Sequence, residues 1–339
     1  MSKETTQIVK GIAILLMLFL HLFNKMPDIS GYVPLLSFGT TPLAHLLTRA
    51  ANPVPFFLIV SGYGLSAVYH SRGYATGYLW RRTLRLYVHY WLALTVFLLL
   101  ILGFSAHCPS LSPLSLLLNY TCLQPSYNLT LWFLFPYVLL SVTSGGLFRL
   151  LARVGPWHLL AVAFLLHLPA ALLISRYYDS FFSTHALPYQ AALYFYLLFP
   201  FLIGTVMERY AASGRSLTWH RLEGCNIPVV LLLLLLVTLR CLTERNLPNP
   251  EYAFAFIWLL LHLRFRPVVA GFFTAMGRYS MMMWFVHKYL FEDLLHNLVY
   301  APRYPLLIYP LAVVLTFLTA YVCQFLADKL VGRLPVFRK

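Results

Sequence analysis

Long apolar runs separated by short polar segments dominate the sequence. Runs of roughly 18–25 residues recur along the chain, which is the length that a helix needs to cross a hydrocarbon core about 30 Å thick. The runs are continuous rather than alternating, so a transmembrane β-barrel is not expected. The pattern predicts an all-α polytopic membrane protein with a bundle of about ten transmembrane helices. The expected spans are residues 7–25, 50–69, 84–106, 129–150, 157–175, 190–208, 226–243, 251–265, 268–291 and 305–328.

The composition supports a membrane protein. Of the 339 residues, 60% are hydrophobic and only 10% are charged, and the mean hydropathy is +0.74. A soluble protein of this length carries far more charge on its surface. The formal net charge of +15 would suggest nucleic-acid binding in a soluble protein. In a membrane protein, basic residues in short loops set the topology instead, so nucleic-acid binding is not expected.

Basic residues gather in every second connecting segment, which predicts the orientation of the chain. One set of segments holds Lys3, Lys10, Arg72, Arg81, Arg82, Arg85, Arg149, Arg153, Arg209, Arg215, Arg221, Arg264, Arg266, Lys329, Arg333, Arg338 and Lys339. The opposite segments hold only Lys25, Arg49, Arg176, Arg245 and Arg303. The positive-inside rule then places the first set and both termini in the cytoplasm.

The domain organisation is expected to be simple. No small-residue cleavage site follows the first apolar run, so it is interpreted as a retained helix rather than a signal peptide. We expect one integral-membrane domain over residues 1–339, with no appended soluble domain. Residues 251–265 are short for a span and follow the turn-rich segment LPNP, so that span is expected to be tilted or partial.

The cysteines and histidines are candidate ligands for a metal or a haem. The five cysteines show no zinc-binding spacing, and no metal site is expected. Cys108 and Cys122 share one loop and either pair as a disulfide or remain free thiols. Twelve histidines leave a haem site open, although no histidine pair in register on facing helices stands out in the sequence.

The first span carries Lys10 near its start and His21 within its apolar run. At about 100° per residue, their spacing brings both side chains to one helix face, about 16 Å apart along the axis. An ionisable residue inside a membrane is costly and usually faces a cavity or a partner. His21 is therefore either hydrogen-bonded to a neighbouring helix or a general base toward a hydroxyl.

Three arginines begin the third span, in YLWRRTLRLY. Arg82 and Arg85 are three residues apart and are expected to share a helix face. Together with Arg81 they either set the topology or form a clamp for phosphate, which suits the planar guanidinium fork.

Two further segments combine packing and candidate binding residues. In FFLIVSGYG, residues 56–64, Ser61, Gly62 and Gly64 allow close helix approach or a local helix break, and a packing role is favoured. In LWFLFPY, residues 131–137, Trp132 is either an interfacial anchor or a surface on which a sugar stacks.

The segment MGRYSMMMWFVHKYLFED, residues 276–293, gathers charge near one helix. Arg278 is expected toward the middle of the membrane, as a structural charge or a ligand contact. His287 and Glu292 are expected near the outer end, where Glu292 is a solvated carboxylate or part of a site.

Taken together, these segments resemble the acyltransferase-3 family of integral-membrane acyltransferases, from residue 8 to about residue 328. The motifs that carry the resemblance are, in chain order, Lys10…His21, Phe56-Phe57…Ser61-Gly62-Tyr63, Arg82-Thr83-Leu84-Arg85, Leu131-Trp132-Phe133-Leu134 and Gly277-Arg278-Tyr279-Ser280…His287. Five such motifs in order are more specific than any one alone. The chain departs from the family where Lys10 replaces a usual arginine, which keeps the charge but loses bidentate geometry. It also has Val88 and His89 where the family often has a proline.

The resemblance implies transfer of an acyl group, usually acetyl, from cytosolic acyl-CoA to a hydroxyl of a cell-surface glycan or glycolipid precursor. It makes His21 catalytic, as a general base or through an acyl-histidine, and it assigns Arg82 and Arg85 to acyl-CoA. As a separate hypothesis, we expect Arg81 to join them at the CoA phosphates and Lys10 to steer the anionic donor. The acceptor or supporting residues would be Trp132, Arg278, His287 and Glu292.

The expected partners are acyl-CoA as co-substrate, the glycan or glycolipid acceptor and the bilayer of the plasma (inner) membrane, with no permanently bound cofactor. Two other functions remain open. The chain could be a transporter or flippase of a lipid-linked sugar or polysaccharide, although no internal repeat or matched pair of broken helices is visible. It could also be a non-catalytic scaffold that keeps the fold.

Overall fold

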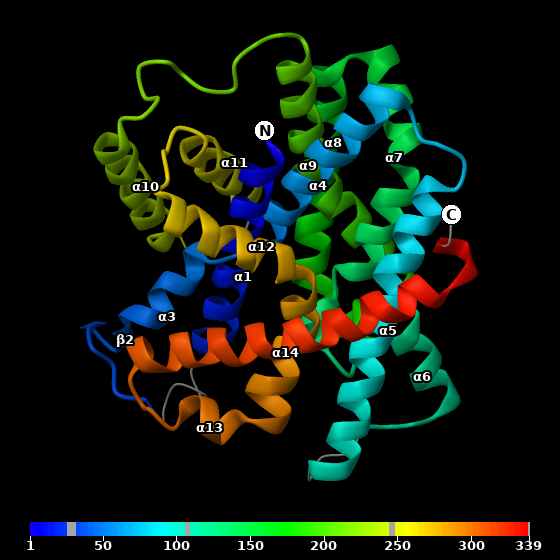
Figure 1. Ribbon diagram of the computed structural model, residues 1–339, viewed down its shortest axis with the longest axis vertical. Coiled ribbons are helices and arrows are strands. Elements are labelled where there is room, and N and C mark those ends of the chain that lie inside the picture. The colour runs from blue at the N-terminus through cyan, green and yellow to red at the C-terminus, as the bar shows by residue number, and fades with distance from the viewer. Residues whose placement is uncertain (26–31, 106–108, 244–247, 338–339) are drawn as a thin grey trace.

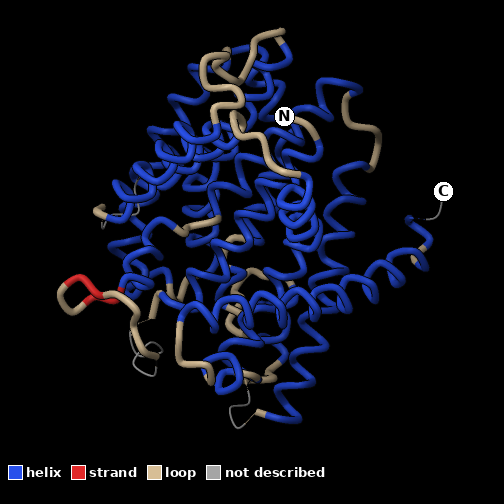
Figure 2. Tube along the Cα trace, turned by 60° about the vertical axis from the view of Figure 1, so that its left-hand side comes forward, coloured by secondary structure: helices blue, strands red, loops and turns tan. Residues whose placement is uncertain are grey.

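The computed structural model describes residues 1–25, 32–105, 109–243 and 248–337, and over these residues the protein is a helical bundle with one short hairpin at its edge (Figure 1, Figure 2). In the hairpin, β1 (Ser37–Phe38) pairs with β2 (Thr41–Pro42) in antiparallel register. The α-helices are α1 (Lys3–Phe23), α3 (Leu43–Leu47), α4 (Val54–Arg72), α5 (Tyr78–Phe104), α6 (Pro113–Tyr120), α7 (Leu134–Val154), α8 (Pro156–Tyr177), α9 (Ala186–Ala212), α10 (Asn226–Cys241), α11 (Asn249–Leu260), α12 (Pro267–Lys288), α13 (His296–Tyr300) and α14 (Pro305–Arg333). Short 3-10 turns form η1 (Thr48–Ala50), η2 (Leu129–Leu131) and η5 (Pro335–Phe337), and π-helical turns form η3 (Tyr178–Phe182) and η4 (Tyr289–Leu294).

Seven helical segments of the described residues are long and apolar enough to cross a membrane. They are Lys3–Phe23, Leu43–Arg72, Tyr78–Phe104, Leu129–Val154, Pro156–Phe182, Ala186–Ala212 and Pro305–Arg333. A multi-pass helical membrane protein is therefore confirmed. The other three expected spans form α10, α11 and α12, which are not among these seven. The 12 residues of α11 extend only about 18 Å, less than the thickness of a bilayer core. A count of ten spans stays a prediction.

We call the end of the bundle at which α1 begins the N-terminal end, and the end at which α1 finishes the far end (Figure 1). The Met1 amino group donates a hydrogen bond to the Tyr63 hydroxyl of α4. The Arg85 guanidinium of α5 lies 5.5 Å from the ring centre of Phe337. Both ends of the described chain thus contact the α4–α5 part of the bundle. The cytoplasmic location of the termini stays a prediction, and three of the basic residues behind it, Arg245, Arg338 and Lys339, lie outside the described residues.

The turn between α4 and α5, residues 73–77, depends on two glycines. Gly73 and Gly77 have φ angles of +64° and +76°, which residues with a side chain rarely adopt. The Gly73 amide donates to the Tyr69 carbonyl at 2.8 Å and ends α4. The turn brings the arginine-rich start of α5 beside the end of α4.

Close contact between α1 and α12 depends on Gly11 and Gly277. A Cβ atom on Gly11 would lie 2.0 Å from the carbonyl oxygen of Phe273, so only glycine fits. The two helices run in the same direction, because Gly11 contacts the first part of α12 while His21, ten residues later, lies against His287. His287 likewise follows Gly277 by ten residues. The glycine crossing therefore sets the register that places the two histidines at one level.

We expect Gly277→Ala to lower the free energy of unfolding by about 1–3 kcal/mol, because the new Cβ must displace backbone. It would lie 2.0 Å from the carbonyl oxygen of Gln7. Gly271→Ala, in the same helix, is the matched control, because a Cβ there meets nothing within 4 Å. Thermal unfolding of the purified protein in detergent compares the two variants. Equal melting temperatures would contradict the role of Gly277.

A second glycine crossing joins α4 to α9. A Cβ on Gly62 would lie 1.9 Å from the carbonyl oxygen of Phe201, whereas one on Gly64 would meet nothing within 4 Å. The predicted packing role is thus confirmed for Gly62 only. Toward the ends of these helices, the buried Glu208 carboxylate accepts hydrogen bonds from Ser66 Oγ at 2.6 Å and from His70 Nδ1 at 2.7 Å.

Candidate functional site

The most distinctive feature at the far end of the bundle is a contact between two histidine rings. His21, in the last turn of α1, and His287, in the last turn of α12, have ring centroids 4.9 Å apart, with the ring planes inclined by 41°. His287 is fully buried, whereas His21 is partly exposed. Rings in contact at this distance leave no room for a haem iron between them. The contact brings two imidazole rings from different helices together.

The hydrogen bonds of His287 determine its tautomer. Its Nδ1 donates to the carbonyl oxygen of Trp284 at 2.8 Å and lies 3.2 Å from that of Met283. Because carbonyl oxygens only accept, Nδ1 carries the proton, and in the neutral ring Nε2 carries a lone pair. Nε2 is buried and has no hydrogen-bond partner among the described residues. An unsatisfied acceptor is therefore held beside His21.

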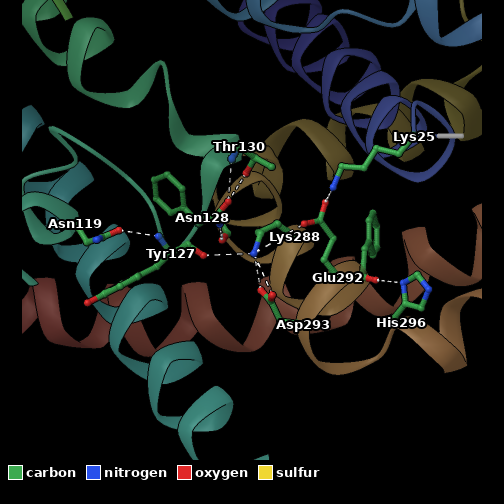
Figure 3. A network of polar contacts seen from close by, with 11 residues as sticks. Lys25, Asn119, Tyr127, Asn128, Thr130, Lys288, Glu292, Asp293 and His296 are labelled. Carbon is green, nitrogen blue, oxygen red and sulfur yellow. Dashed lines mark hydrogen bonds and ion pairs between the residues drawn. The ribbon is translucent and has the colours of Figure 1, made fainter. Parts of the chain in front are cut away.

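Ion pairs hold the chain that follows His287 (Figure 3). The Lys288 ammonium lies 2.9 Å from the Asp293 carboxylate and 3.5 Å from the carbonyl oxygen of Tyr127. Glu292 pairs with Lys25, just after α1, at 2.8 Å. Burial raises the pKa of the Asp293 carboxyl, and the Lys288 ammonium opposes that shift. These contacts tie the ends of α1 and α12 to one another.

The segment that precedes α7 holds the last turns of α12 from another side. Asn128 Nδ2 donates to the carbonyl oxygen of Phe285 at 3.1 Å, and Trp284 Nε1 donates to that of Thr130 at 3.0 Å. The ring of Phe133 stacks on Trp284 with centroids 4.1 Å apart. Sequence reasoning missed Asn128, because nothing in the local pattern indicates its distant partner.

We expect Asp293→Ala to lower the free energy of unfolding by about 1–3 kcal/mol, since the partly buried Lys288 ammonium would lose its carboxylate. Glu292, 3.9 Å from Lys288, limits the loss. Asp179→Ala removes an exposed carboxylate of η3 and is expected to change stability by less than about 0.5 kcal/mol. Thermal unfolding measures both. Similar melting temperatures for the two variants would show that the Lys288 pair is not structural.

A second polar cluster lies nearer the N-terminal end. Arg82 Nη2 donates to the hydroxyl of Tyr137 at 2.5 Å, and Ser61 Oγ donates to the same oxygen at 3.3 Å. Lys10 lies within electrostatic range of both Tyr137 and Arg82. Lys10 and His21 are on one face of α1, about 16 Å apart along its axis. The helix thus connects this cationic cluster, formed by Lys10, Arg82 and Tyr137, with the histidine pair.

The cationic cluster has the properties of an anion site. No carboxylate of the described residues forms a salt bridge with Lys10 or Arg82. Partly buried cations without a counter-ion are costly, so a bound anion would stabilise them. The Tyr137 oxygen accepts two hydrogen bonds, which leaves its own proton free to donate. Tyr137 ends the segment LWFLFPY, residues 131–137, but the sequence did not mark it as a site residue, because a tyrosine in an apolar helix is common.

Aromatic rings border the cationic cluster. Tyr74 and Tyr78 stack with centroids 5.3 Å apart and lie within electrostatic range of Arg82. Burial raises the pKa of Tyr74 to about 12, so its phenol is neutral at physiological pH. Its oxygen lies 2.9 Å from Ser144 Oγ. These rings give the cluster a flat apolar wall.

The other predicted site residues are distributed differently. Arg81 and Arg85 are exposed, and Arg85 contacts Phe337 rather than the Tyr137 hydroxyl that binds Arg82. Arg278 is exposed on α12, and no described contact places it beside His21. Glu292 forms an ion pair with Lys25, just after α1, and so lies close to the end of that helix.

Trp132 and Cys122 lie in the segment before α7. Trp132 is partly buried and lines a cavity of about 940 Å³ between this segment, α4, α8 and α9. Cys122 is a buried free thiol that donates to the carbonyl oxygen of Leu131 at 3.5 Å. Cys108, the other cysteine of the predicted pair, lies outside the described residues.

Comparison with known proteins gives one result. A family model described as an acyltransferase domain matches residues 7–325. No curated protein and no solved structure matches the chain. The matched region runs from α1 into α14 and therefore contains both the histidine pair and the cationic cluster. The resemblance inferred from the five motifs is confirmed, and the chain belongs to the acyltransferase-3 family of acyltransferases.

Proposed function

We propose that the protein transfers an acyl group, most simply acetyl, from cytosolic acyl-CoA to a hydroxyl of a cell-surface glycan or glycolipid precursor at the plasma membrane. The observation that carries the proposal is the placement of Lys10 and His21 on one face of α1. Lys10 belongs to the cationic cluster, with which no carboxylate of the described residues forms a salt bridge, and His21 belongs to the histidine pair. A donor with an anionic head and a distant reactive thioester fits these two ends.

In this mechanism the phosphates of acyl-CoA bind at Lys10, Arg82 and Tyr137. Arginine suits phosphate because its guanidinium donates two parallel hydrogen bonds. The exposed Arg81 and Arg85, on the same helix as Arg82, extend the positive surface and attract the anionic donor. The pantetheine arm then extends along α1 toward the far end and brings the thioester to His21.

The chemical step takes place at the histidine pair. His21 removes the proton of the acceptor hydroxyl as that oxygen bonds to the thioester carbonyl carbon. The carbon–sulfur bond breaks, and the departing thiolate of CoA takes the proton from the His21 imidazolium. The lone pair on His287 Nε2 stabilises the imidazolium while it exists. Transient acylation of His21, followed by attack of the hydroxyl, is the alternative route to the same products. Arg278 has no role in this mechanism.

Purified protein in proteoliposomes, supplied with radiolabelled acetyl-CoA and a membrane glycan fraction, tests the proposal. We expect label to enter the glycan only when donor and protein are both present. Alkaline hydroxylamine should release this label from the glycan, because it cleaves the ester that joins an acyl group to a hydroxyl. If no acyl-CoA acts as donor and the protein instead moves a lipid-linked sugar across the bilayer, it is a flippase and the proposal fails.

A further inference from the structure

The cavity of about 940 Å³ between α4, α8, α9 and the segment that precedes α7 is lined by residues of a distinct chemical character. Its volume falls in the range of about 300–1,000 Å³ that is typical of small-molecule sites. Neither His21 nor His287 lines it. Its aromatic lining residues are Trp132, Tyr178, Phe182, Tyr189 and Tyr196. The space is therefore separate from the histidine pair and needs its own explanation.

Within the part of the chain that the structure describes, two lining side chains carry buried polar atoms without a hydrogen-bond partner. His167, 1% exposed, donates through Nδ1 to the carbonyl oxygen of Tyr196 at 2.7 Å, and its Nε2 has no partner among the described residues. Gln190, 2% exposed, donates through Nε2 to the carbonyl oxygen of Leu123 at 2.9 Å, and its Oε1 has none. Leaving such groups unpaired costs about 1–3 kcal/mol each.

Both unpaired atoms are hydrogen-bond acceptors. The Nδ1 proton of His167 is already donated, so Nε2 of the neutral ring offers a lone pair, and the amide oxygen of Gln190 can only accept. A ligand that satisfies them must donate hydrogen bonds from at least two groups. A hydrocarbon chain would leave both atoms unpaired, so a lipid tail does not fit this lining.

The lining also excludes a charged ligand. Among the described residues that line the cavity there is no lysine, arginine, aspartate or glutamate. Burying an ion here would leave it without a counter-ion, which rules out the phosphates of acyl-CoA. An uncharged molecule with several hydroxyls and flat apolar faces remains, because its faces pack on the aromatic rings while its hydroxyls reach the two acceptors. This description is that of a neutral carbohydrate.

The cavity wall is linked to the histidine pair. Trp132, in the wall, contacts the ring of Phe133 at 5.4 Å between centroids. Phe133 stacks on Trp284, whose carbonyl oxygen accepts the Nδ1 proton of His287. We propose that the cavity binds uncharged sugar units and, resting on the function proposed above, that these are the units of the acceptor glycan next to the acylated one.

Equilibrium binding to the purified protein in nanodiscs tests this proposal, with the neutral trisaccharides maltotriose, cellotriose and chitotriose as probes and trigalacturonic acid as a charged counterpart. We expect saturable binding of at least one neutral trisaccharide and none of the charged one. Gln190→Leu and His167→Phe each remove one acceptor at similar volume and should weaken binding by about 5- to 100-fold.

Gln324→Leu is the matched control, because the Oε1 of Gln324 in α14 also has no partner in the described part of the chain, but Gln324 does not line the cavity. It should bind the trisaccharide as well as the unaltered chain does. Failure of all three neutral probes, equal binding of trigalacturonic acid, or full affinity in both cavity variants overturns the proposal. A phospholipid that native mass spectrometry finds on the unaltered chain, and not on the cavity variants, overturns it in favour of a lipid.

A further variant separates this proposal from the proposed function. His21→Ala should still bind the neutral trisaccharide, since His21 does not line the cavity. Sugar binding without any acyl transfer by the unaltered chain would mean that the carbohydrate site stands and the acyltransferase mechanism fails. Acyl transfer with an unchanged Michaelis constant for the glycan in Gln190→Leu would mean the reverse.

Discussion

Replacement of His21 by alanine is expected to lower the rate of acetyl transfer by a factor of about 10²–10⁴, the contribution typical of a positioned general base. Its ring is in contact with that of His287, whose Nε2 has no hydrogen-bond partner among the described residues. The measurement is incorporation of labelled acetyl into membrane glycan at a saturating concentration of acetyl-CoA. Because His21 is partly exposed, its loss should leave the melting temperature nearly unchanged.

His296→Ala is the matched control for this result. His296 lies on α13 at the same end of the bundle, and its Nδ1 contacts only the backbone carbonyl of Phe291 in the described hydrogen bonds. This variant should retain acetyl transfer. Retained transfer in His21→Ala, or an equal loss in both variants, would remove His21 from the catalytic role.

Replacement of Arg82 by alanine has the second large expected effect. It should lower kcat/KM for acyl-CoA by about 10- to 100-fold, because a hydrogen bond to a charged group contributes about 1.5–3 kcal/mol. The effect should appear mainly in the Michaelis constant for acyl-CoA, since uniform binding of the donor is lost. Arg82→Lys should restore part of it, because lysine keeps the charge without the fork.

Arg81→Ala is the control for this experiment, since Arg81 is the preceding residue and is exposed. It should change the Michaelis constant only slightly and mainly at low ionic strength, where long-range attraction matters. A larger effect of Arg85→Ala than of Arg82→Ala would place the donor on the exposed face of α5 near Phe337 and contradict the site at Tyr137.

The sequence predicted the helices well because an apolar run long enough to span a bilayer is a local property. Each expected span has a helix in the structure, although only seven segments reach the length and hydropathy of a membrane span. Helical periodicity likewise placed Lys10 and His21 on one face. Both inferences depend on residues of a single segment.

Helical periodicity does not predict which residues the two arginines of α5 contact. Periodicity put Arg82 and Arg85 on one face of α5, but a neighbour decides what each side chain meets. Tyr137 of α7 binds Arg82, whereas Phe337 near the end of the chain lies under Arg85. A spacing of three residues leaves about 60° between two side chains, which is enough to direct them toward different elements.

The sequence by itself determined that this is a helical membrane protein of the acyltransferase-3 family, with a histidine and a lysine aligned on its first helix. Only the tertiary structure decided that His287 is the neighbour of His21 and that Tyr137 binds Arg82. It alone placed the unpaired acceptors of His167 and Gln190 in one cavity. The physical reason is that these residues lie on helices far apart in the chain. Their meeting depends on backbone contacts such as the glycine crossing of α1 and α12, which no local pattern of residues determines.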